Sequence, residues 1–351
     1  MKIAIDYRLA AVSSRGMARY AREITECLVR DYPEEQWILL VTKEGETRIM
    51  AENPKMAPYL KVLPHDGMVL AEQWGMAATV QRLNADVLWC PYNTMPLLGL
   101  QGIKVVVTVH DLIFMDPIEG GTIYQRLGAL YRRLCIRKVT RRADRLLTVS
   151  RFTGNEMTRV LGVPPSRWRV TYNKVDSMAA AILARGAVKR DDFFFTLSGD
   201  APHKNLDRLM DWFSRNPSKR LLVAGVPRDS KIRQRAPQNV IILGRMTDEE
   251  LADLYVRCKA FVFLSLKEGF GLPVAEAMAA RCPMLLSDRH SIPEVAGSLG
   301  VYVNPEDDES IDRGFQEIEN RVIDDKAFSE SLTRFVGWDE SARIVHEAMI
   351  D

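Results

Sequence analysis

Two carboxylates and two glycines stand within nine residues of the second half, in Glu268-Gly269-Phe270-Gly271-Leu272-Pro273-Val274-Ala275-Glu276. The segment follows an apolar run that predicts a strand, and Pro273 suits the first turn of a helix. Because glycines present backbone N–H groups and a helix N-terminus adds about half a positive charge, the loop suits phosphate. We expect Glu268 in the loop and Glu276 in the first helical turn, within reach of ribose hydroxyls. The alternative is an ordinary turn whose glutamates favour a helix start.

Two other segments place reactive side chains just after predicted strands. Lys204, in Pro202-His203-Lys204-Asn205-Leu206, begins a helix where its ammonium could neutralise a pyrophosphate. His110 follows Val107-Thr108-Val109 and could hydrogen-bond a sugar hydroxyl. Each has an ordinary alternative, since single lysines are mostly solvated and a histidine at a strand end is often structural. A glycosidase would also use two carboxylates roughly 5–10 Å apart, and the spacing of Glu268 and Glu276 leaves hydrolysis open. The glycines between them favour a phosphate-bearing donor.

The elements that must position these residues follow from the apolar pattern. Short β-branched runs alternate with helical patterns along the whole chain, which is typical of βαβ units in parallel sheets covered on both faces. The predicted strands are 2–6, 37–42, 60–64, 87–91, 105–110, 146–150 and 169–173, then 193–197, 221–225, 240–244, 260–265, 283–287 and 300–303. Thr247-Asp248-Glu249-Glu250 has the form of a capping box and predicts a helix start.

The predicted class is α/β, with two doubly wound, Rossmann-like domains facing each other across a cleft. The length of 351 residues suits two domains of ~150 residues each. We assign residues 1–175 to an N-terminal domain, 176–192 to a linker, 193–335 to a C-terminal domain and 336–351 to a final helix. In such folds ligands bind at the carboxyl ends of the strands, where the candidate residues lie.

Composition excludes several other classes of protein. Lys and Arg number 48 against 46 Asp and Glu, so the net charge of +2 disfavours a nucleic-acid partner. Five cysteines without a Cys-x-x-Cys pair disfavour a disulfide framework and a zinc site, and they fit a reducing cytoplasm. No apolar run reaches the ~18 residues that span a bilayer. The N-terminus has no signal-peptide core, because Asp6 and Arg8 interrupt it. The glycine patterns of dinucleotide and P-loop sites are missing.

A basic segment runs from Arg126 to Arg145, with leucines and other apolar residues between its arginines. It predicts an amphipathic cationic helix that lies on an anionic membrane, where each basic residue contributes roughly 1 kcal/mol. The alternative is a solvated charged face with a stripe of core residues. The residues assigned to the membrane contact are Arg132, Arg133, Arg137 and Arg141, and the apolar residues are Leu127, Leu130, Tyr131, Leu134 and Val139.

Taken in order over nearly the whole chain, these motifs resemble glycosyltransferase family 4, whose members are retaining enzymes of the GT-B fold. The two glutamates that bracket Gly-Phe-Gly-Leu-Pro carry most of the resemblance. The other matching segments are Gly16-Met17-Ala18-Arg19-Tyr20, His110-Asp111, Thr148-Val149-Ser150, Lys204-Asn205-Leu206, Leu243-Gly244, Pro293-Glu294-Val295 and the start of the last helix at Trp338.

The resemblance implies a role for each matching residue. Lys204 would hold the donor diphosphate, Glu276 the ribose and Glu268 the transferred sugar. His110 would touch that sugar from the other domain, and it forms the catalytic set with Lys204 and Glu268. The implied donor-binding residues are Gly16, Lys204, Asn205, Gly269, Phe270, Gly271, Leu272 and Glu276.

The implied reaction moves a hexose from a nucleotide-sugar to a glycan or lipid-linked acceptor in cell-envelope polysaccharide or lipopolysaccharide synthesis. The N-terminal half is most similar to mannosyltransferases of the family, which predicts GDP-mannose as the donor. No metal and no cofactor are expected, because no Asp-x-Asp motif follows a strand. The expected location is the cytoplasm, at the inner face of the cytoplasmic membrane.

Three departures from the family pattern support an alternative. Leu197-Ser198-Gly199-Asp200 lacks a common arginine, and Lys174 and Arg281 replace customary glycines. The alternative is a degenerate GT-B scaffold that binds a nucleotide-sugar or a partner protein without turnover.

Overall fold

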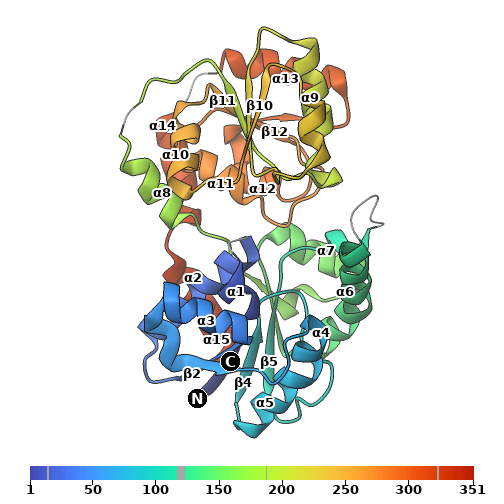
Figure 1. Cartoon of the computed structure of the whole chain (residues 1–351), viewed down its shortest axis with the longest axis vertical. Helices are drawn as coiled ribbons and strands as arrows, with labels where there is room; N and C mark the ends of the chain where they lie inside the picture. Colours follow the sequence, from blue (N-terminus) through green and yellow to red (C-terminus); the bar gives the residue numbers. More distant parts are fainter. Residues whose placement is uncertain (14–15, 117–122, 187, 322–323) are drawn as a thin grey trace. The chain divides into compact units, whose positions relative to one another are not determined.

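The computed structural model describes residues 1–13, 16–116, 123–186, 188–321 and 324–351. They divide into two units, each considered by itself. The N-terminal unit contains the described residues up to Asn173 together with Gly337–Asp351, and the C-terminal unit is Lys174–Val336. The chain therefore leaves the N-terminal unit after Asn173 and returns to it at Gly337, as the red final helix in Figure 1 illustrates.

In its described residues the N-terminal unit contains a seven-stranded parallel sheet in the order β3-β2-β1-β4-β5-β6-β7. Its central strands are almost wholly buried, as expected for apolar runs covered on both faces. The strands are β1 (Lys2–Asp6), β2 (Gln36–Val41), β3 (Leu60–Val62), β4 (Val87–Cys90), β5 (Lys104–Val109), β6 (Arg145–Thr148) and β7 (Trp168–Val170).

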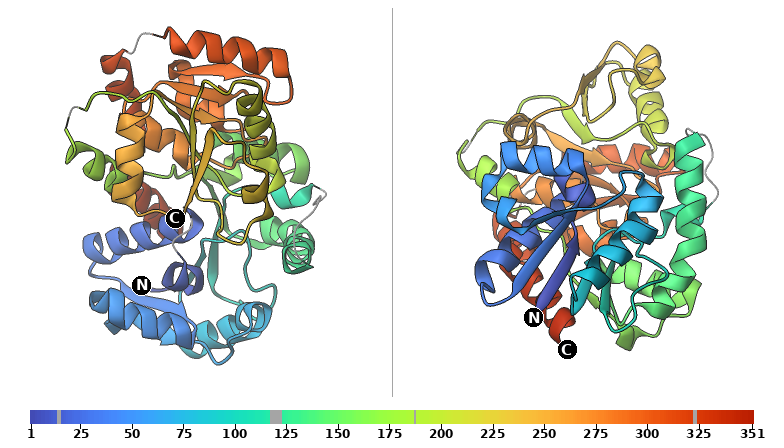
Figure 2. Two further views of the ribbon diagram at one scale, coloured as in Figure 1. Left: turned by 45° about the horizontal axis from the view of Figure 1, so that its top comes forward. Right: turned by 60° about the horizontal axis from the view of Figure 1, so that its bottom comes forward.

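Helices connect these strands, and the last one arrives from the far end of the chain. Helix α15 packs on α2, and in the right-hand view of Figure 2 the red end of the chain lies beside the blue N-terminal elements. Trp338 lies edge-on to Tyr20 at 6.2 Å, and His346 stacks on Tyr32 at 3.6 Å. The helices are α1 (Arg8–Val12), α2 (Gly16–Asp31), α3 (Lys43–Glu52), α4 (Met68–Leu70), α5 (Ala77–Arg82), α6 (Ile123–Arg142), α7 (Arg151–Leu161) and α15 (Trp338–Ile350), with 3₁₀ turns η1 (Pro54–Tyr59), η3 (Ile113–Met115) and η4 (Pro165–Arg167) and a π-helical segment η2 (Ala71–Met76).

The described C-terminal unit is built around a six-stranded parallel sheet in the order β10-β9-β8-β11-β12-β13. Its strands are β8 (Phe194–Leu197), β9 (Leu221–Ala224), β10 (Val240–Gly244), β11 (Ala260–Phe263), β12 (Met284–Ser287) and β13 (Gly300–Val303). Its helices are α8 (Asp176–Leu183), α9 (Leu206–Arg215), α10 (Asp248–Arg257), α11 (Leu272–Ala279), α12 (Ile292–Ala296), α13 (Asp308–Glu319) and α14 (Asp325–Leu332), with 3₁₀ turns η5 (Pro202–Lys204), η6 (Lys231–Arg235), η7 (Gly297–Leu299) and η8 (Thr333–Phe335).

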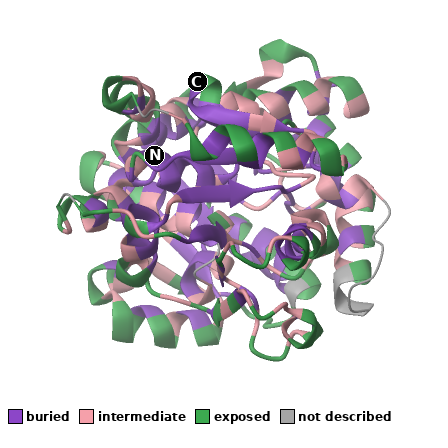
Figure 3. Cartoon of the chain, turned by 90° about the horizontal axis from the view of Figure 1, so that it is seen from above, coloured by how far each residue is buried: buried purple, intermediate pink, exposed green. Residues whose placement is uncertain are grey.

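Aromatic packing fixes one helical layer on this second sheet. Helix α9 turns a strongly apolar face inward, and its Trp212 stacks on Phe315 of α13 at 3.5 Å. Phe194 of β8 packs edge-on against Phe213 and Phe315. In Figure 3, which is coloured by burial, the strands are mostly purple (buried) and the outward faces of the helices are green (exposed). The carboxyl ends of the strands are thereby held in fixed register.

The predicted α/β class is confirmed, and each predicted strand appears in one of the two sheets, in most cases one or two residues shorter. The capping box also forms, with Thr247 and Glu250 bonding each other's backbone N–H groups. Residues 176–192, expected as a linker, instead begin with helix α8, which packs on α10 inside the C-terminal unit. The Ala-rich stretch is apolar enough to bury Met178 and Ile182, so it joins the core.

Candidate functional site

Lys204 and Glu268 meet in the C-terminal unit. Strands β8 and β11 are neighbours at the point where the strand order reverses, and the two residues follow these strands. The Lys204 ammonium lies 2.7 Å from a Glu268 carboxylate oxygen, and both side chains stay partly exposed, at 24% and 12%. A parallel sheet opens a ligand crevice at this reversal point. The structure therefore brings together two of the predicted site residues at the expected edge of the sheet.

Short-range bonds hold the Lys204 turn against the end of β11. The carbonyl of His203 accepts hydrogen bonds from the Leu266 N–H at 2.7 Å and the Ser265 hydroxyl at 3.1 Å. Asn205 adopts a left-handed conformation, φ +56°, which asparagine tolerates, and its amide donates to the Pro305 carbonyl at 2.8 Å. Asn205, predicted to bind the donor, thus has a structural contact through its side chain.

The glycine loop after β11 leads into α11 as predicted. Gly271 takes φ +89° and stands immediately before the helix, and Pro273 is in its first turn. No side chain caps this helix start among the described residues, so its N-terminal partial charge is not neutralised by a capping carboxylate. The Ser291 hydroxyl donates to the Glu268 carbonyl at 3.0 Å, and buried Phe270 packs edge-on against Phe335. These contacts fix the loop on both sides.

Glu276 lies in the second turn of α11, not in the first turn as predicted. Gly271 lets the helix begin at Leu272, which turns Glu276 inward, where it is only 3% exposed. The Tyr255 hydroxyl of α10 donates to its carboxylate at 2.9 Å. Burial, and then the Glu276 charge, raise the pKa of Tyr255 well above its usual value, so this phenol keeps its proton. The sequence analysis did not identify the contact between Tyr255 and Glu276.

His110 lies in the N-terminal unit, directly after β5. Its Nε2 is 2.8 Å from the Pro91 carbonyl, which can only accept, so Nε2 carries the proton. Burial lowers the pKa of His110 to about 4, and the ring is therefore neutral at physiological pH. The ring is 5% exposed and packs edge-on against Tyr20 at 5.0 Å. Gly16, the remaining predicted residue of this unit, is exposed at the start of α2.

The N-terminal sheet reverses its strand order between β1 and β4, and a buried charge cluster occupies that point. Arg8 donates to both oxygens of Asp6 at 2.8 Å and to Glu72 at 3.0 Å. Glu72, on the π-helical segment η2, also accepts from the hydroxyls of Thr94 and Tyr131. Glu72 lies 64 residues from Arg8 and 59 residues from Tyr131 in the sequence, so no local spacing predicts these contacts.

Two departures from the family pattern have a structural account. Arg281 has a left-handed backbone, with φ +49°. Glycine adopts this conformation without steric cost, which explains why glycine is customary at this position. Lys174 is buried, and its ammonium donates to the Arg334 carbonyl at 3.0 Å within the C-terminal unit.

The apolar residues expected on helix α6 divide between two faces. Leu127, Leu130 and Leu134 are 50–66% exposed, whereas Val139 is buried in a stripe with Ala129, Cys135 and Ile136. Of the four arginines assigned to a membrane contact, Arg133 donates to the carbonyls of Phe114 and Asp116, and Arg132 lies over the Phe114 ring. Arg137 and Arg141 are exposed.

The described residues contain no helix long and apolar enough to cross a membrane. They also contain no group of three or more His, Cys, Asp and Glu side chains placed to hold a metal ion.

Comparison with known families places the fold and the site in one class of enzyme, the GT-B glycosyltransferases. The model described as Glycosyl transferases group 1 matches residues 182–333, and the model described as Glycosyltransferase Family 4 matches residues 14–178. The chain belongs to glycosyltransferase family 4. This confirms the resemblance carried by Lys204 and the Glu268–Glu276 loop.

Individual relatives agree with this assignment. The O-antigen chain mannosyltransferase RfbU of Salmonella typhimurium is 26% identical over 263 residues, which cover 72% of this chain and 70% of RfbU. The serotype-specific mannosyltransferase WbdA of Escherichia coli is 29% identical over 65% of this chain, and the match spans only 30% of WbdA. Sucrose-phosphate synthase from Thermosynechococcus elongatus has the same fold, with a TM-score of 0.71 at 15% identity over 99% of this chain and 98% of the synthase.

Proposed function

We propose that this glycosyltransferase moves a mannosyl group from GDP-mannose to a glycan or lipid-linked acceptor, with retention at the anomeric carbon, during synthesis of cell-envelope polysaccharide or lipopolysaccharide. The sugar is inferred from relatives that are mannosyltransferases. The observation that carries the proposal is the Lys204–Glu268 pair at the reversal point of the C-terminal sheet, beside the uncapped start of α11.

The pair has the chemistry that a leaving diphosphate requires. Breaking the bond from the anomeric carbon to phosphate develops positive charge on the sugar and negative charge on the nucleotide diphosphate. In the proposed complex the diphosphate replaces Glu268 as the partner of Lys204, and the α11 N-terminus adds a second stabilising charge. Glu268 is then released toward the hydroxyls and the developing charge of the sugar. No divalent metal takes part in this scheme.

Glu276 is proposed to bind the ribose of the donor. Its carboxylate accepts a hydrogen bond from Tyr255, and a carboxylate can accept several hydrogen bonds on its two oxygens. Tyr255 thereby sets the orientation of the carboxylate before the donor arrives, and a preset acceptor loses less entropy on binding.

The N-terminal unit supplies His110 and the Gly16 loop in this proposal. Because His110 is neutral and protonated on Nε2, its ring acts as a hydrogen-bonding group toward the sugar and not as a cation. Gly16, where a Cβ would meet nothing within 4 Å, begins a 16-residue helix whose N-terminus suits the donor phosphates.

A thermal-shift panel of GDP-, UDP-, ADP- and dTDP-sugars tests donor binding. A ligand at 100 times its Kd stabilises the protein by about 2.7 kcal/mol, so GDP-mannose should raise the Tm most. Lys204→Ala should abolish the shift, whereas the matched control Lys231→Ala, at an exposed position of the same unit, should keep it. A panel without any shift would contradict donor binding.

Turnover tests the choice between an enzyme and a binding scaffold. Transfer of mannose to a lipid-linked acceptor, in the presence of EDTA and with the product anomer matching the donor by NMR, is the expected result. Donor binding without transfer to any acceptor would favour the scaffold alternative. Loss of activity in EDTA and its recovery with Mn²⁺ would contradict the metal-free scheme.

We also propose that α6 contacts the anionic inner face of the cytoplasmic membrane. Arg137, Lys138 and Arg141 are the exposed cations that support this contact, because Arg132 and Arg133 are engaged with the η3 segment. Such attraction is electrostatic and weakens as salt increases. Binding to vesicles that contain phosphatidylglycerol at low salt, and its loss in Arg137→Gln with Arg141→Gln, is the expected result.

A further inference from the structure

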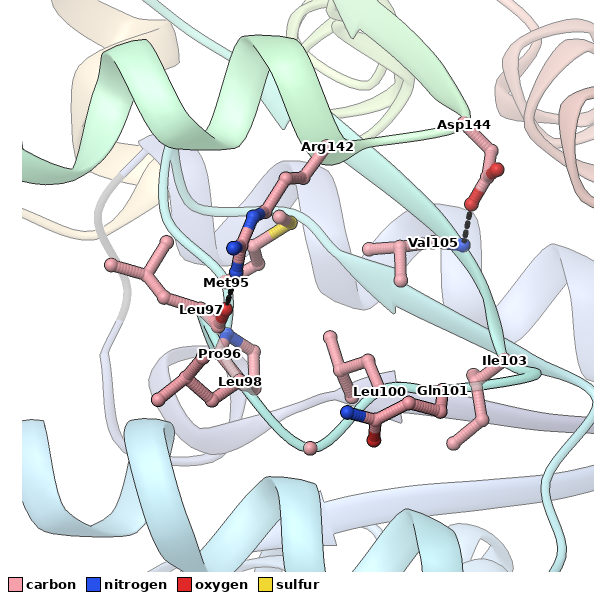
Figure 4. A pocket seen from close by; sticks show the side chains of 11 residues that line it. Met95, Pro96, Leu97, Leu98, Leu100, Gln101, Ile103, Val105, Arg142 and Asp144 are labelled. Carbon is pink, nitrogen blue, oxygen red and sulfur yellow. Dashed lines mark hydrogen bonds between the residues drawn. The ribbon is translucent and has the colours of Figure 1, made fainter.

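A hollow of about 480 Å³ opens in the N-terminal unit between the η2–α5 segment, the 97–99 turn and the end of α6. This size falls within the range of small-molecule sites in proteins. Its walls are mainly apolar, with polar groups at the rim; the residues that matter here are Trp74, Ala77, Leu98, Lys138 and Arg142. On the other side of the 97–99 turn lies a second hollow of about 380 Å³, drawn in Figure 4.

Large apolar side chains stand at the hollow without a covering element. Trp74 is 62% exposed and Leu98 72% exposed, the latter beside Gly99, whose φ of +75° forms the turn. Leu134, 66% exposed, precedes Lys138 by one turn of α6 and extends the apolar surface. Contiguous exposed apolar surface of this kind marks a binding surface, because each side chain gains free energy when it leaves water.

The charges around the hollow have one sign. Helix α6 carries no Asp or Glu between Ile123 and Arg142, and its exposed last turns present Arg137, Lys138 and Arg141. The Arg142 guanidinium reaches over the turn and donates to the Leu97 carbonyl, as Figure 4 shows, so the turn is held to the cationic end of the helix. An apolar floor beneath cations complements a ligand with a hydrocarbon part and an anionic head.

We propose that this hollow binds an anionic phospholipid of the bilayer, with acyl-chain carbons against Trp74 and Leu98 and the phosphate at Lys138 and Arg142. The inference rests on the membrane contact proposed for α6 and adds a different component to it. The electrostatic attraction between the arginines and the membrane surface weakens as salt increases, whereas the apolar contribution of Trp74 and Leu98, which enter the interface, does not. A second copy of the chain would cover the leucines but would bring the cations Lys138 and Arg142, the charged residues that line this hollow, close to their own copies.

Vesicle flotation separates the two components. The probe is vesicles of phosphatidylglycerol and phosphatidylethanolamine, at low salt and at 0.5 M NaCl. Trp74→Gln with Leu98→Gln should reduce binding at 0.5 M NaCl at least tenfold and leave much of the low-salt binding. Arg137→Gln with Arg141→Gln should do the reverse. Leu183→Gln, which removes an equally exposed leucine from α8 of the other unit, is the matched control and should bind as wild type does.

Tryptophan quenching tests the insertion directly. Trp74 is 62% exposed, Trp168 is half-buried and the other four tryptophans are buried, so acyl chains brominated near the headgroup should quench chiefly Trp74. The quenching should disappear in Trp74→Phe. An unchanged Tm and an unchanged donor shift will show that each variant is folded.

Three outcomes would overturn the inference. If wild-type binding is lost completely at 0.5 M NaCl, the contact with the vesicle is purely electrostatic. That result would contradict lipid binding in the hollow and would leave the membrane contact proposed for α6 intact. Equal binding by the Trp74/Leu98 variant would do the same. If the wild type sediments as a dimer and the Trp74/Leu98 variant as a monomer, the apolar surface binds a second copy of the chain instead of a lipid. Absence of low-salt binding by wild type would instead remove the proposed membrane contact itself.

Discussion

The two sheets reverse their strand order in the same way, but the residues at the two reversal points have different environments. In the C-terminal unit, Lys204 and Glu268 form one ion pair whose members remain partly exposed. In the N-terminal unit, Arg8 donates to both Asp6 and Glu72, whose side chains are only 1% and 4% exposed, while its own side chain is 12% exposed. In the proposed function the C-terminal reversal point offers its charges to the donor, whereas the charges at the N-terminal reversal point bond within the protein.

The difference separates a binding function from a structural one. The Lys204–Glu268 pair keeps contact with solvent and is held by a single ion pair, so we expect its partners to be exchanged for a diphosphate at smaller cost than those of a buried network. A buried network is costly to open, because any charge that loses its partner is left desolvated. We therefore expect substitutions at the first point to change activity and substitutions at the second to change folding.

The largest effect is expected for Arg8→Met, which leaves the carboxylates of Asp6 and Glu72 buried without their cation. Removal of one partner from a buried ion pair costs about 3–5 kcal/mol, measured as the free energy of unfolding in urea. The matched control is Arg159→Met, which breaks an exposed pair with Glu156 and should cost about 0.5 kcal/mol or less. Equal losses for the two variants would remove the contrast between the reversal points.

The second effect concerns pH and His110. Its pKa in the folded state, about 4, lies below the usual 6.5, so the unfolded chain binds a proton first as the pH falls. The contribution of neutral His110 to the free energy of unfolding is fully present above pH 6.5. The free energy of unfolding should decrease by about 3 kcal/mol as the pH falls toward 4. In His110→Gln this decrement should vanish, whereas His65→Gln, at an exposed position, should retain it. Parallel pH curves for wild type and His110→Gln would show that the ring is not buried in neutral form.

The third effect is catalytic. Glu268→Gln keeps the shape of the side chain but removes its charge, and we expect kcat to fall about a hundredfold, equivalent to ~2.7 kcal/mol, with the donor KM nearly unchanged. The free energy of unfolding should change by less than about 1 kcal/mol, because the pair with Lys204 is partly exposed. Glu309→Gln, on the exposed side of α13, is the control. A loss of stability larger than the loss of activity would reverse the roles assigned to the two reversal points.

The smallest effect is expected at Arg281, outside both reversal points. Its left-handed backbone costs an arginine about 1 kcal/mol relative to glycine. Its exposed contacts with Asp325 and Ser329, at 3.8 and 3.4 Å, offset little of that cost. Arg281→Gly should raise the free energy of unfolding by about 0.5–1 kcal/mol and leave kcat unchanged. A destabilised variant would mean that the guanidinium contacts outweigh the backbone strain.

The sequence predicted those parts of the molecule that depend on local patterns. Apolar β-branched runs located the strands, and the glycines with Pro273 located the start of α11, because these signals lie within a few residues. Lys204 and Glu268 were both placed after predicted strands of the C-terminal domain, at the edge where ligands bind, but their direct contact was not predicted.

Other features depend on which surfaces the fold brings together. The spacing of Leu127, Leu130 and Leu134 predicts that they share a face of α6 but does not say which face is buried. The stripe at Ala129, Ile136 and Val139 has an equally good helical spacing, and it packs closer to the sheet. The bond of Tyr255 to Glu276 and the Arg8–Glu72 pair join different elements, and neither has a signature in the sequence.

The packing of α15 on α2 also determines the order in which the chain can fold during synthesis. Residues 337–350 complete the N-terminal unit but leave the ribosome only after all of residues 174–336. At about 5–20 residues per second, Tyr20 and its neighbours wait roughly 15–65 s for Trp338. The unit that is translated second, being continuous, can therefore finish folding before the unit that is translated first. During that delay the uncovered face of α2 is the part of the nascent chain most in need of a chaperone.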